Sequence, residues 1–275
     1  MAVRSKIEFA SATDAGLVRS FNEDSLAYDE ALGLCVLADG MGGYKAGDVA
    51  SSMATRLVLE EFAAFARDEG GVETQEDGLS VPGAALKRAI ERANGAIHRA
   101  AQSDKSCQGM GATVAAVIFQ GSRAVVAHVG DSRVYRYRDG DLTLLTYDHS
   151  LLQEQVGLGL ITPEDAKLSH NRNLVTRALG VGPQVKVDVR EEGAAGGDIY
   201  LLCSDGLNDM VDDADIGLVL AELNANLSLA ASQLVQIAND NGGHDNVSVL
   251  IARVGARPRP SRGWLRQLLS SFGIA

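Results

Sequence analysis

The chain has 275 residues, 46% of them hydrophobic and 5% aromatic, so one large domain or two small ones can bury a core made mainly of aliphatic side chains. Lys and Arg number 25 against 36 Asp and Glu, and the resulting net charge of −11 argues against general nucleic-acid binding, which needs a basic surface. The last 20 residues carry four Arg and no acidic residue, so a basic tail follows an acidic body.

The cysteines and the hydropathy pattern indicate a protein of a reducing compartment. Three cysteines lack metal-type spacing, and Cys35 and Cys203 lie within apolar runs, where a cysteine is usually a buried thiol. The N-terminus lacks the apolar core of a signal peptide, and no stretch reaches the roughly 18 apolar residues that span a membrane. We therefore expect a cytoplasmic, monomeric protein without a transmembrane segment.

The N-terminal part is predicted to form three strands and two long helices. The strands are 7–13, 25–28 and 32–38. A helix over about 48–67 follows, because its apolar residues recur with helical period, and an acidic loop covers 68–78. The second helix begins after Ser80, a suitable N-cap, and has Pro82 in its first turn.

The rest of the chain is predicted to be rich in strands. Strands are expected at 112–119, 124–129, 134–138, 142–145, 185–190, 198–203 and 246–254, with helices near 213–222 and 228–239. Residues 150–179 have a mixed pattern, with a short Leu-rich helix and a helix start at Thr162-Pro163, which suits a flap. Because strands and helices do not alternate regularly, the order favours an α+β sandwich of antiparallel sheets with helices outside. A Pro/Arg linker at 257–261 and an amphipathic helix at 264–272 would end the chain.

Acidic residues stand at the ends of the predicted strands. They are Glu23 and Asp24, Asp39 in A-D-G-M-G-G, Asp131 in H-V-G-D, Asp205 in C-S-D-G, and Asp245 in G-H-D-N. A carboxylate at the mouth of a buried strand is costly unless positive charge meets it.

Two simpler explanations compete with a functional cluster. An Asp-Gly pair after a strand is commonly a hairpin turn, which we accept for Asp139-Gly140. A loop and a helix follow Asp39 and Asp205, so a hairpin does not explain these residues. Helix capping or solvent exposure can explain one such acid, but four strand-end aspartates are better explained by clustering.

Clustered carboxylates repel one another by more than roughly 1 kcal/mol per pair, so protonation or a bound cation must reduce this repulsion. Only oxygen ligands are available, which favours Mg²⁺ or Mn²⁺ over Zn²⁺. Two such ions activate water and stabilise a transferring phosphoryl group. Arg19 precedes the acidic pair at 23–24, and its guanidinium can grip a phosphate, although alone it would be interpreted as a surface residue.

These motifs resemble those of the type 2C metal-dependent protein serine/threonine phosphatases (the PPM family), in their short bacterial form. Eight motifs occur in family order, at 16–25, 38–43, 109–113, 128–133, 146–151, 174–180, 201–207 and 243–248. The resemblance covers about residues 5–254, which would form the phosphatase domain, and leaves 255–275 as a tail. It implies a four-layer α-β-β-α sandwich, two antiparallel sheets flanked by helix pairs.

The resemblance also implies a metal site and a reaction. Two Mn²⁺ or Mg²⁺ ions, with a third weaker ion, would be held by Asp39, the carbonyl of Gly40, Glu23 through water, Asp131, Asp205 and Asp245. Arg19 would hold the substrate phosphate, while Asp24 and Asn246 would support the site. The implied reaction is attack of a metal-bridging water on phosphoserine or phosphothreonine without a phosphoenzyme. The partners would be phosphorylated proteins, including a bacterial Ser/Thr kinase and its substrates.

The chain departs from the family pattern at two positions. Met41 stands where some members have a His that is proposed as the general acid, and Tyr44 stands where many bacterial relatives have His. The proton donor therefore stays open, with His149 and His244 as candidates against a structural role.

Two rival functions and a role for the tail are kept beside this interpretation. The rivals are a pseudophosphatase that binds phosphoproteins without turnover and a hydrolase of small phosphate esters. The tail, with its apolar face from Trp264 to Phe272, could bind a membrane surface or a partner weakly, or be disordered or packed on the protein.

Overall fold

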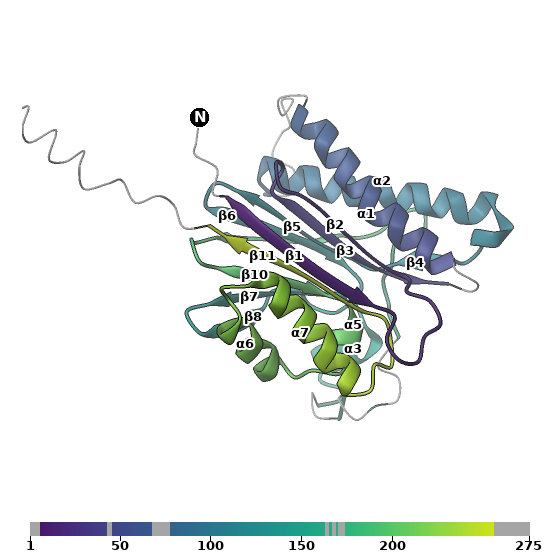
Figure 1. Cartoon of the computed structure of the whole chain (residues 1–275). Coiled ribbons are helices and arrows are strands. Elements are labelled where there is room, and N and C mark those ends of the chain that lie inside the picture. The colour runs from purple at the N-terminus through teal and green to yellow at the C-terminus, as the bar shows by residue number, and fades with distance from the viewer. Residues whose placement is uncertain are drawn as a thin grey trace, which may run out of the picture.

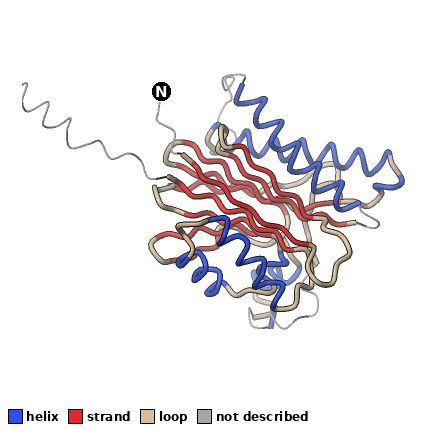
Figure 2. Tube along the Cα trace, viewed as in Figure 1, coloured by secondary structure: helices blue, strands red, loops and turns tan. Residues whose placement is uncertain are grey.

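Two antiparallel β-sheets lie face to face between two groups of helices in the computed structural model of the chain (Figures 1 and 2). The structure describes residues 6–42, 46–67, 78–162, 165, 166, 169 and 174–255. The arrangement confirms the predicted sandwich and its four layers.

One sheet has five strands in the order β1-β11-β10-β7-β8. Their bounds are β1 Ile7–Asp14, β7 Arg133–Arg138, β8 Asp141–Leu144, β10 Ile199–Cys203 and β11 Val247–Val254. In the register of β1 and β11, Ile7 is opposite Val254 and Asp14 is opposite Val247. The end of β1 therefore lies beside the start of β11.

The other sheet has the order β2-β3-β5-β6-β9, with the short strand β4 paired to the end of β3. Their bounds are β2 Asp24–Asp29, β3 Leu34–Met41, β4 Gly111–Ala112, β5 Val114–Gln120, β6 Arg123–Val129 and β9 Asp188–Gly193. The predicted strand 112–119 is thus two strands separated at Thr113, and the predicted strand 185–190 begins only at Asp188.

The helices cover the outer faces of the sheets (Figure 1). The long helices α1 (Ala46–Arg67) and α2 (Val81–Ser103) pack on the second sheet, and the 3-10 turn η1 (Lys105–Cys107) follows α2. On the first sheet, α6 (Asp213–Glu222) and α7 (Leu227–Asp240) form the other outer layer. Two short helices, α3 (Leu151–Gly157) and α5 (Asp205–Asn208), lie in the connections, and α5 was not predicted.

Strand β3 is apolar on both faces because its alternate side chains pack in two different hydrophobic clusters. In β3, Leu34, Val36 and Ala38 pack in the cluster formed with α1 and α2. Cys35 and Leu37 belong instead to the cluster between the sheets. A strand buried on both faces reads as a continuous hydrophobic run rather than an alternating one.

Local signals in the sequence are confirmed at two turns. The Ser80 hydroxyl accepts a hydrogen bond from the N–H of Gly83, as expected of the N-cap of α2. Asp139 has φ of 52° and Gly140 has φ of 92°, which suits the tight hairpin predicted between β7 and β8.

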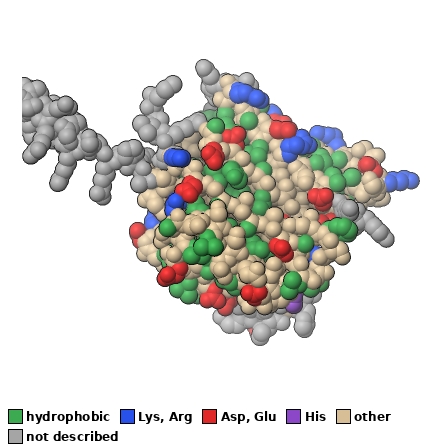
Figure 3. Space-filling view, viewed as in Figure 1, with side chains coloured by type: hydrophobic (Ala, Val, Ile, Leu, Met, Phe, Trp, Pro, Cys, Tyr) green, Lys and Arg blue, Asp and Glu red, His purple; other side chains and the backbone are tan. Residues whose placement is uncertain are grey.

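The surface and the helices agree with the charge and hydropathy patterns. In Figure 3, acidic side chains are spread over the displayed face, and basic ones lie among them near α1 and α2 and near the start of β1. Of the helices in the described part of the chain, none is long and apolar enough to cross a bilayer. The predicted helix start at Pro163, and the tail beyond Gly255 with its predicted linker and helix, lie outside the described residues.

Candidate metal centre and active site

The acidic residues predicted at strand ends meet at one end of the sandwich. Asp39, near the end of β3, is the register partner of Asp24 at the start of β2. Asp205 lies two residues after the end of β10 and Asp245 two residues before the start of β11, and these strands run antiparallel side by side. The pKa of Asp39 is raised well above its usual range, first by burial and then by the nearby charges of Asp24, Asp205, Asp131 and Asp245. The structure therefore brings these five carboxylates together.

Two of these carboxylates have an oxygen without a partner. Burial and the charges of neighbouring aspartates raise the pKa of Asp205 well above normal, and its Oδ1 is buried without a hydrogen bond. Burial also raises the pKa of Asp24 to about 6. Its Oδ2 accepts a hydrogen bond from the Ser204 hydroxyl at 2.8 Å, but Oδ1 has no partner. Unpaired buried carboxylate oxygens are costly without a compensating cation.

Asp131 connects this cluster to a groove. Burial, followed by the charge of Asp148, raises the pKa of Asp131 to about 6. Asp131 and Asp205 line a groove of about 780 Å³ between α3 and the α5–α6 region.

Asp209 is an acidic neighbour that the sequence analysis missed. It lines the same groove, and its charge contributes to the raised pKa of both Asp131 and Asp205. It stands four residues after Asp205, at the C-cap of α5. The i, i+4 spacing was visible in the sequence, but it places both acids on one side only if a helix forms there.

Asn246 holds the backbone around Glu23. Its Oδ1 accepts a hydrogen bond from the N–H of Glu23 at 2.8 Å. Its Nδ2 donates to the carbonyls of Ala15 at 3.0 Å and Phe21 at 2.8 Å. One buried amide therefore fixes the loop between β1 and β2 against the start of β11.

Glycine is required where the backbones of the site approach most closely. A Cβ on Gly40 would lie 2.1 Å from the carbonyl oxygen of Gly47, and one on Gly206 would lie 2.1 Å from that of Asn246. The N–H of Gly40 donates to the carbonyl of Glu23 at 3.1 Å. The glycine after each Asp therefore permits backbone packing, and is not a hairpin residue.

Arg19 is the cation beside this cluster. Its Nη2 lies 2.7 Å from Oδ2 of Asp245, and 54% of its side chain is exposed. The hydrogen bond to Asp245 raises the pKa of Arg19, with smaller contributions from the charges of Asp205 and Asp39. About half of the Arg19 side chain thus stays open to solvent and to a ligand.

The two histidines considered as proton donors differ in their surroundings. His149 is buried, with Nδ1 bonded to the N–H of Gly130 at 3.0 Å and Nε2 to Asp188 at 3.1 Å. Because both of its nitrogens are engaged, the structure favours a structural role for His149. His244 is exposed beside Asp245. Met41 ends β3, and Tyr44 lies outside the described residues.

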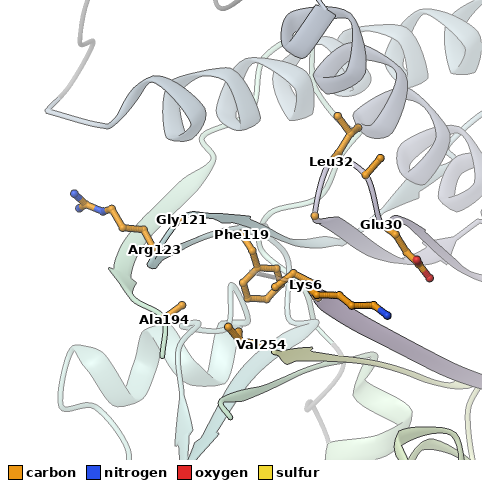
Figure 4. Close-up of a pocket in the computed structure, with 11 residues that line it drawn as sticks. Lys6, Glu30, Leu32, Phe119, Gly121, Arg123, Ala194 and Val254 are labelled. Carbon is orange, nitrogen blue, oxygen red and sulfur yellow. The ribbon is translucent and has the colours of Figure 1, made fainter. Parts of the chain in front are cut away.

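A second pocket lies at the opposite end of the sandwich (Figure 4). Ile7 at the start of β1, Val254 at the end of β11 and Phe119 near the end of β5 line it. Its charged lining residues are Lys6, Glu30 and Arg123. It shares no residue with the acidic groove, so we place the candidate active site at the acidic end.

The residues of the acidic end fit hard divalent cations. The unpartnered oxygens of Asp24 and Asp205, and their pKa values, raised first by burial and then by neighbouring carboxylates, show that ionising these groups is costly unless a cation binds beside them. The donors are carboxylate and backbone oxygens, which suit Mg²⁺ and Mn²⁺.

Comparisons with known sequences find relatives over most of the chain. The family model described as Protein phosphatase 2C matches residues 18–237. The chain is 40% identical over 250 residues to the serine/threonine protein phosphatase PstP of Mycobacterium tuberculosis, covering 90% of this chain and 45% of PstP. It is 37% identical over 242 residues to the serine/threonine phosphatase stp of Listeria innocua, covering 87% of this chain and 92% of stp. The chain thus spans less than half of the mycobacterial relative.

Solved structures show the same fold. The crystal structure of M. tuberculosis PstP superposes with a TM-score of 0.80 at 38% identity, covering 90% of this chain and 99% of that one. Stp1 from Staphylococcus aureus gives a TM-score of 0.80 at 32% identity, covering 93% of this chain and 98% of that one. The PstP catalytic domain solved in complex with two manganese ions gives a TM-score of 0.76 at 38% identity, covering 90% of this chain and 98% of that one.

Proposed function

The chain belongs to the protein phosphatase 2C family, and from this we propose that it is a metal-dependent phosphoprotein phosphatase that hydrolyses phosphoserine and phosphothreonine. One observation carries the proposal: five carboxylates gather at one end of the sandwich, and Asp24 and Asp205 each leave a buried oxygen unpaired. The related PstP catalytic domain, solved with two manganese ions, supports the choice of cation.

The residues that would hold the ions are the strand-end acids Asp39, Asp131, Asp205 and Asp245 and, as the family resemblance implies, the carbonyl of Gly40 and Glu23 through water. Asp24 and Asn246 would be supporting residues, and we add Asp209 because it lines the same groove as Asp131 and Asp205. When bound, Mn²⁺ or Mg²⁺ lowers the pKa of the attacking water and offsets the charge of the phosphoryl oxygens. We assign two ions to the core of the site and a third, weaker ion to the side of Asp131.

The chain's own residues bind and orient the substrate. Arg19 is close enough to Asp245 to form an ion pair at 2.7 Å, yet keeps half of its side chain exposed. With the acidic cluster neutralised, its guanidinium can hold two phosphate oxygens in a bidentate grip. Asn246 keeps Glu23 and the preceding loop in place through three hydrogen bonds.

A phosphate-release assay with a matched control tests this function. We expect release from a phosphoserine peptide with Mn²⁺ or Mg²⁺, none with EDTA, and loss of most activity in Asp39→Asn and Asp205→Asn. Asp139→Asn is the control, because it changes an Asp-Gly at a hairpin outside the site, where Asn also tolerates positive φ. Full activity of the two site variants, or activity that persists in EDTA, would exclude the proposal.

The same assay separates the rival functions. Metal-dependent binding of the phosphopeptide without release would indicate a pseudophosphatase. Turnover of p-nitrophenyl phosphate without turnover of any phosphopeptide would indicate a hydrolase of small phosphate esters.

The cellular role follows from the proposed activity. We place the enzyme in the cytoplasm as a monomer, with residues 5–254 as the phosphatase domain and 255–275 as a tail, and with a Ser/Thr kinase and its substrates as partners. Phosphoproteomes with and without the gene would identify the substrates, and unchanged phosphoproteins would exclude this role. A chain ending at Val254 tests the tail, since unchanged localisation and activity would exclude a targeting role.

A further inference from the structure

His149 is buried at the point where the chain leaves the acidic end of the sandwich. Only 2% of its surface is exposed, and it directly precedes Ser150, the N-cap of α3. Residues 150–179, predicted as a flap, therefore begin at this side chain. A buried polar ring at such a junction needs partners for both nitrogens.

The first partner of His149 is the residue before Asp131. The N–H of Gly130 donates to Nδ1 of His149 at 3.0 Å, and the N–H of His149 donates to the carbonyl of Gly130 at 3.0 Å. Gly130 has φ of +103°, and a Cβ there would lie 2.6 Å from the side chain of Thr113. The two hydrogen bonds thus hold the backbone N–H and the carbonyl of Gly130, which has a positive φ. The next residue is Asp131, a proposed metal ligand.

The second partner fixes the tautomer of the ring. Because Nδ1 accepts a hydrogen bond, the proton of the neutral ring lies on Nε2, which donates to Oδ2 of Asp188 at 3.1 Å. Oδ1 of Asp188 accepts from Arg177 at 3.0 Å. Burial lowers the pKa of His149 to about 4, which agrees with a neutral ring.

The backbone joins the two ends of the flap at the same place. The N–H of Thr176 donates to the carbonyl of His149 at 2.8 Å, and the N–H of Leu151 donates to that of Leu174 at 2.9 Å. Arg177, one residue later, reaches the same Asp188 as the histidine ring. His149 thus contacts both ends of the flap, strand β9 and the turn that presents Asp131.

We propose that His149 is a positioning residue that couples the base of the flap to Asp131, so that its Nδ1 sets the affinity of the weaker metal site on the Asp131 side. This inference rests on the proposed function, which makes Asp131 a metal ligand. His149 acts through the backbone of Gly130 and does not itself contact an ion or the substrate. Groups that orient metal ligands typically change metal affinity 10- to 100-fold when removed.

A direct metal site on the histidines is the competing interpretation. One ligand atom each from His128, His149 and Asp188 lie within 4.8 Å of one another. However, His128 Nε2 bonds to the carbonyl of Tyr147 at 2.9 Å, and Asp188 already pairs with Arg177. The hydrogen bonds and the cation of Arg177 satisfy this group, so we assign it a structural coupling role.

Calorimetric titration of the metal-free protein with Mn²⁺ tests the proposal without measuring turnover. We expect His149→Ala to weaken the weakest binding step about 10-fold while the two tighter steps are unchanged. His149→Asn should keep near-normal affinity, because its amide oxygen can replace Nδ1 as acceptor for Gly130. His149→Gln places its amide near Nε2 instead and should behave like His149→Ala, which keeps the test decisive if the alanine variant fails to fold.

Two further variants complete the design. His98→Ala is the matched control, since the Nδ1 of His98 also bonds to a backbone group, the carbonyl of Gly180 at 2.9 Å, but not beside Asp131. It should lower thermal stability without weakening Mn²⁺ binding. Asp131→Asn should abolish the weakest step.

Three outcomes would overturn the inference. The first is unchanged weak-step affinity in His149→Ala, and the second is equal weakening by His98→Ala or by His149→Asn. The third is loss of a tight binding step in His149→Ala, which would make His149 part of a metal site. If Asp131→Asn leaves all steps intact, the assignment of Asp131 as a ligand fails, and the coupling role fails with it, although phosphatase activity can still be present.

Discussion

Replacing Asp131 with Asn should make the metal-free protein more stable and the metal-loaded protein less so. Burial and nearby acids raise the pKa of Asp131 from 3.8 to about 6 in the folded protein. One pKa unit corresponds to about 1.36 kcal/mol, so the ionised carboxylate lowers the free energy of unfolding by about 3 kcal/mol at pH 7. For a chain of this size, that amounts to a melting-temperature change of roughly 6–12 °C.

The difference in stability between wild type and Asp131→Asn depends on pH. Below pH 4, Asp131 is protonated in both the folded and the unfolded chain, so its contribution vanishes. As pH rises from about 4 to about 6, the unfolded chain loses this proton first, and the metal-free wild type loses stability that the Asn variant retains. Mn²⁺ at more than about 100 times the Kd of the site should reverse the order, because an ion that binds only the folded state stabilises it by RT ln(1 + [Mn²⁺]/Kd) and the variant lacks one ligand.

Urea unfolding of both proteins, in EDTA and in Mn²⁺, at pH 4, 5, 6 and 7.5 measures this difference. The expected result is a gap in EDTA that opens between pH 4 and 6 and favours Asp131→Asn. A variant that is less stable than wild type in EDTA at pH 7.5 would refute the reasoning, since Asp131 would then be stabilised by its surroundings without metal.

Three other changes have defined expected results. Arg19→Ala should lower kcat/KM for a phosphopeptide about 10- to 100-fold, because a charge-assisted hydrogen bond contributes about 1.5–3 kcal/mol. Arg19→Lys should recover only part of the lost kcat/KM. Steady-state kinetics in which the alanine variant matches wild type would contradict this role of Arg19. Gly206→Ala should cost about 1–3 kcal/mol in urea unfolding and lower activity, because its Cβ would lie 2.1 Å from the carbonyl oxygen of Asn246. The control is Gly193→Ala, whose Cβ would meet no atom within 4 Å at a residue without positive φ, and it should keep both stability and activity. Leu201→Ala, at a fully buried position of β10, should lower the free energy of unfolding by about 2–5 kcal/mol, and a smaller loss would mean that the core collapses around the missing side chain.

The strand-end carboxylates were predictable because they follow from local sequence. An apolar run such as 32–38 identifies a buried strand, and an acid directly after it must lie at the edge of the core. That the ends of β3 and β10 coincide at Asp39 and Asp205 depends on how the two sheets pack on each other, which the sequence indicated only through the number of such acids. Clustering was therefore a sound inference from the number of these acids.

Other features depend on contacts between distant residues and could not be predicted. At Thr113, between β4 and β5, the hydroxyl accepts a hydrogen bond from the N–H of Asp39 at 3.0 Å and bonds to the hydroxyl of Ser132 at 2.6 Å. The pairing of His149 with Asp188 joins residues 39 positions apart. No periodicity or propensity encodes either contact, so only the folded chain reveals them.

The central claim is that the acidic end of the sandwich holds the metal ions that make this chain a phosphatase. Its most direct test measures bound Mn²⁺ by calorimetry and phosphate release from a phosphoserine peptide on the same preparations of wild type and Asp39→Asn. We predict that wild type binds two ions tightly and releases phosphate in proportion to their occupancy, whereas Asp39→Asn loses both properties together. Undiminished phosphate release from Asp39→Asn without tightly bound metal would contradict the account.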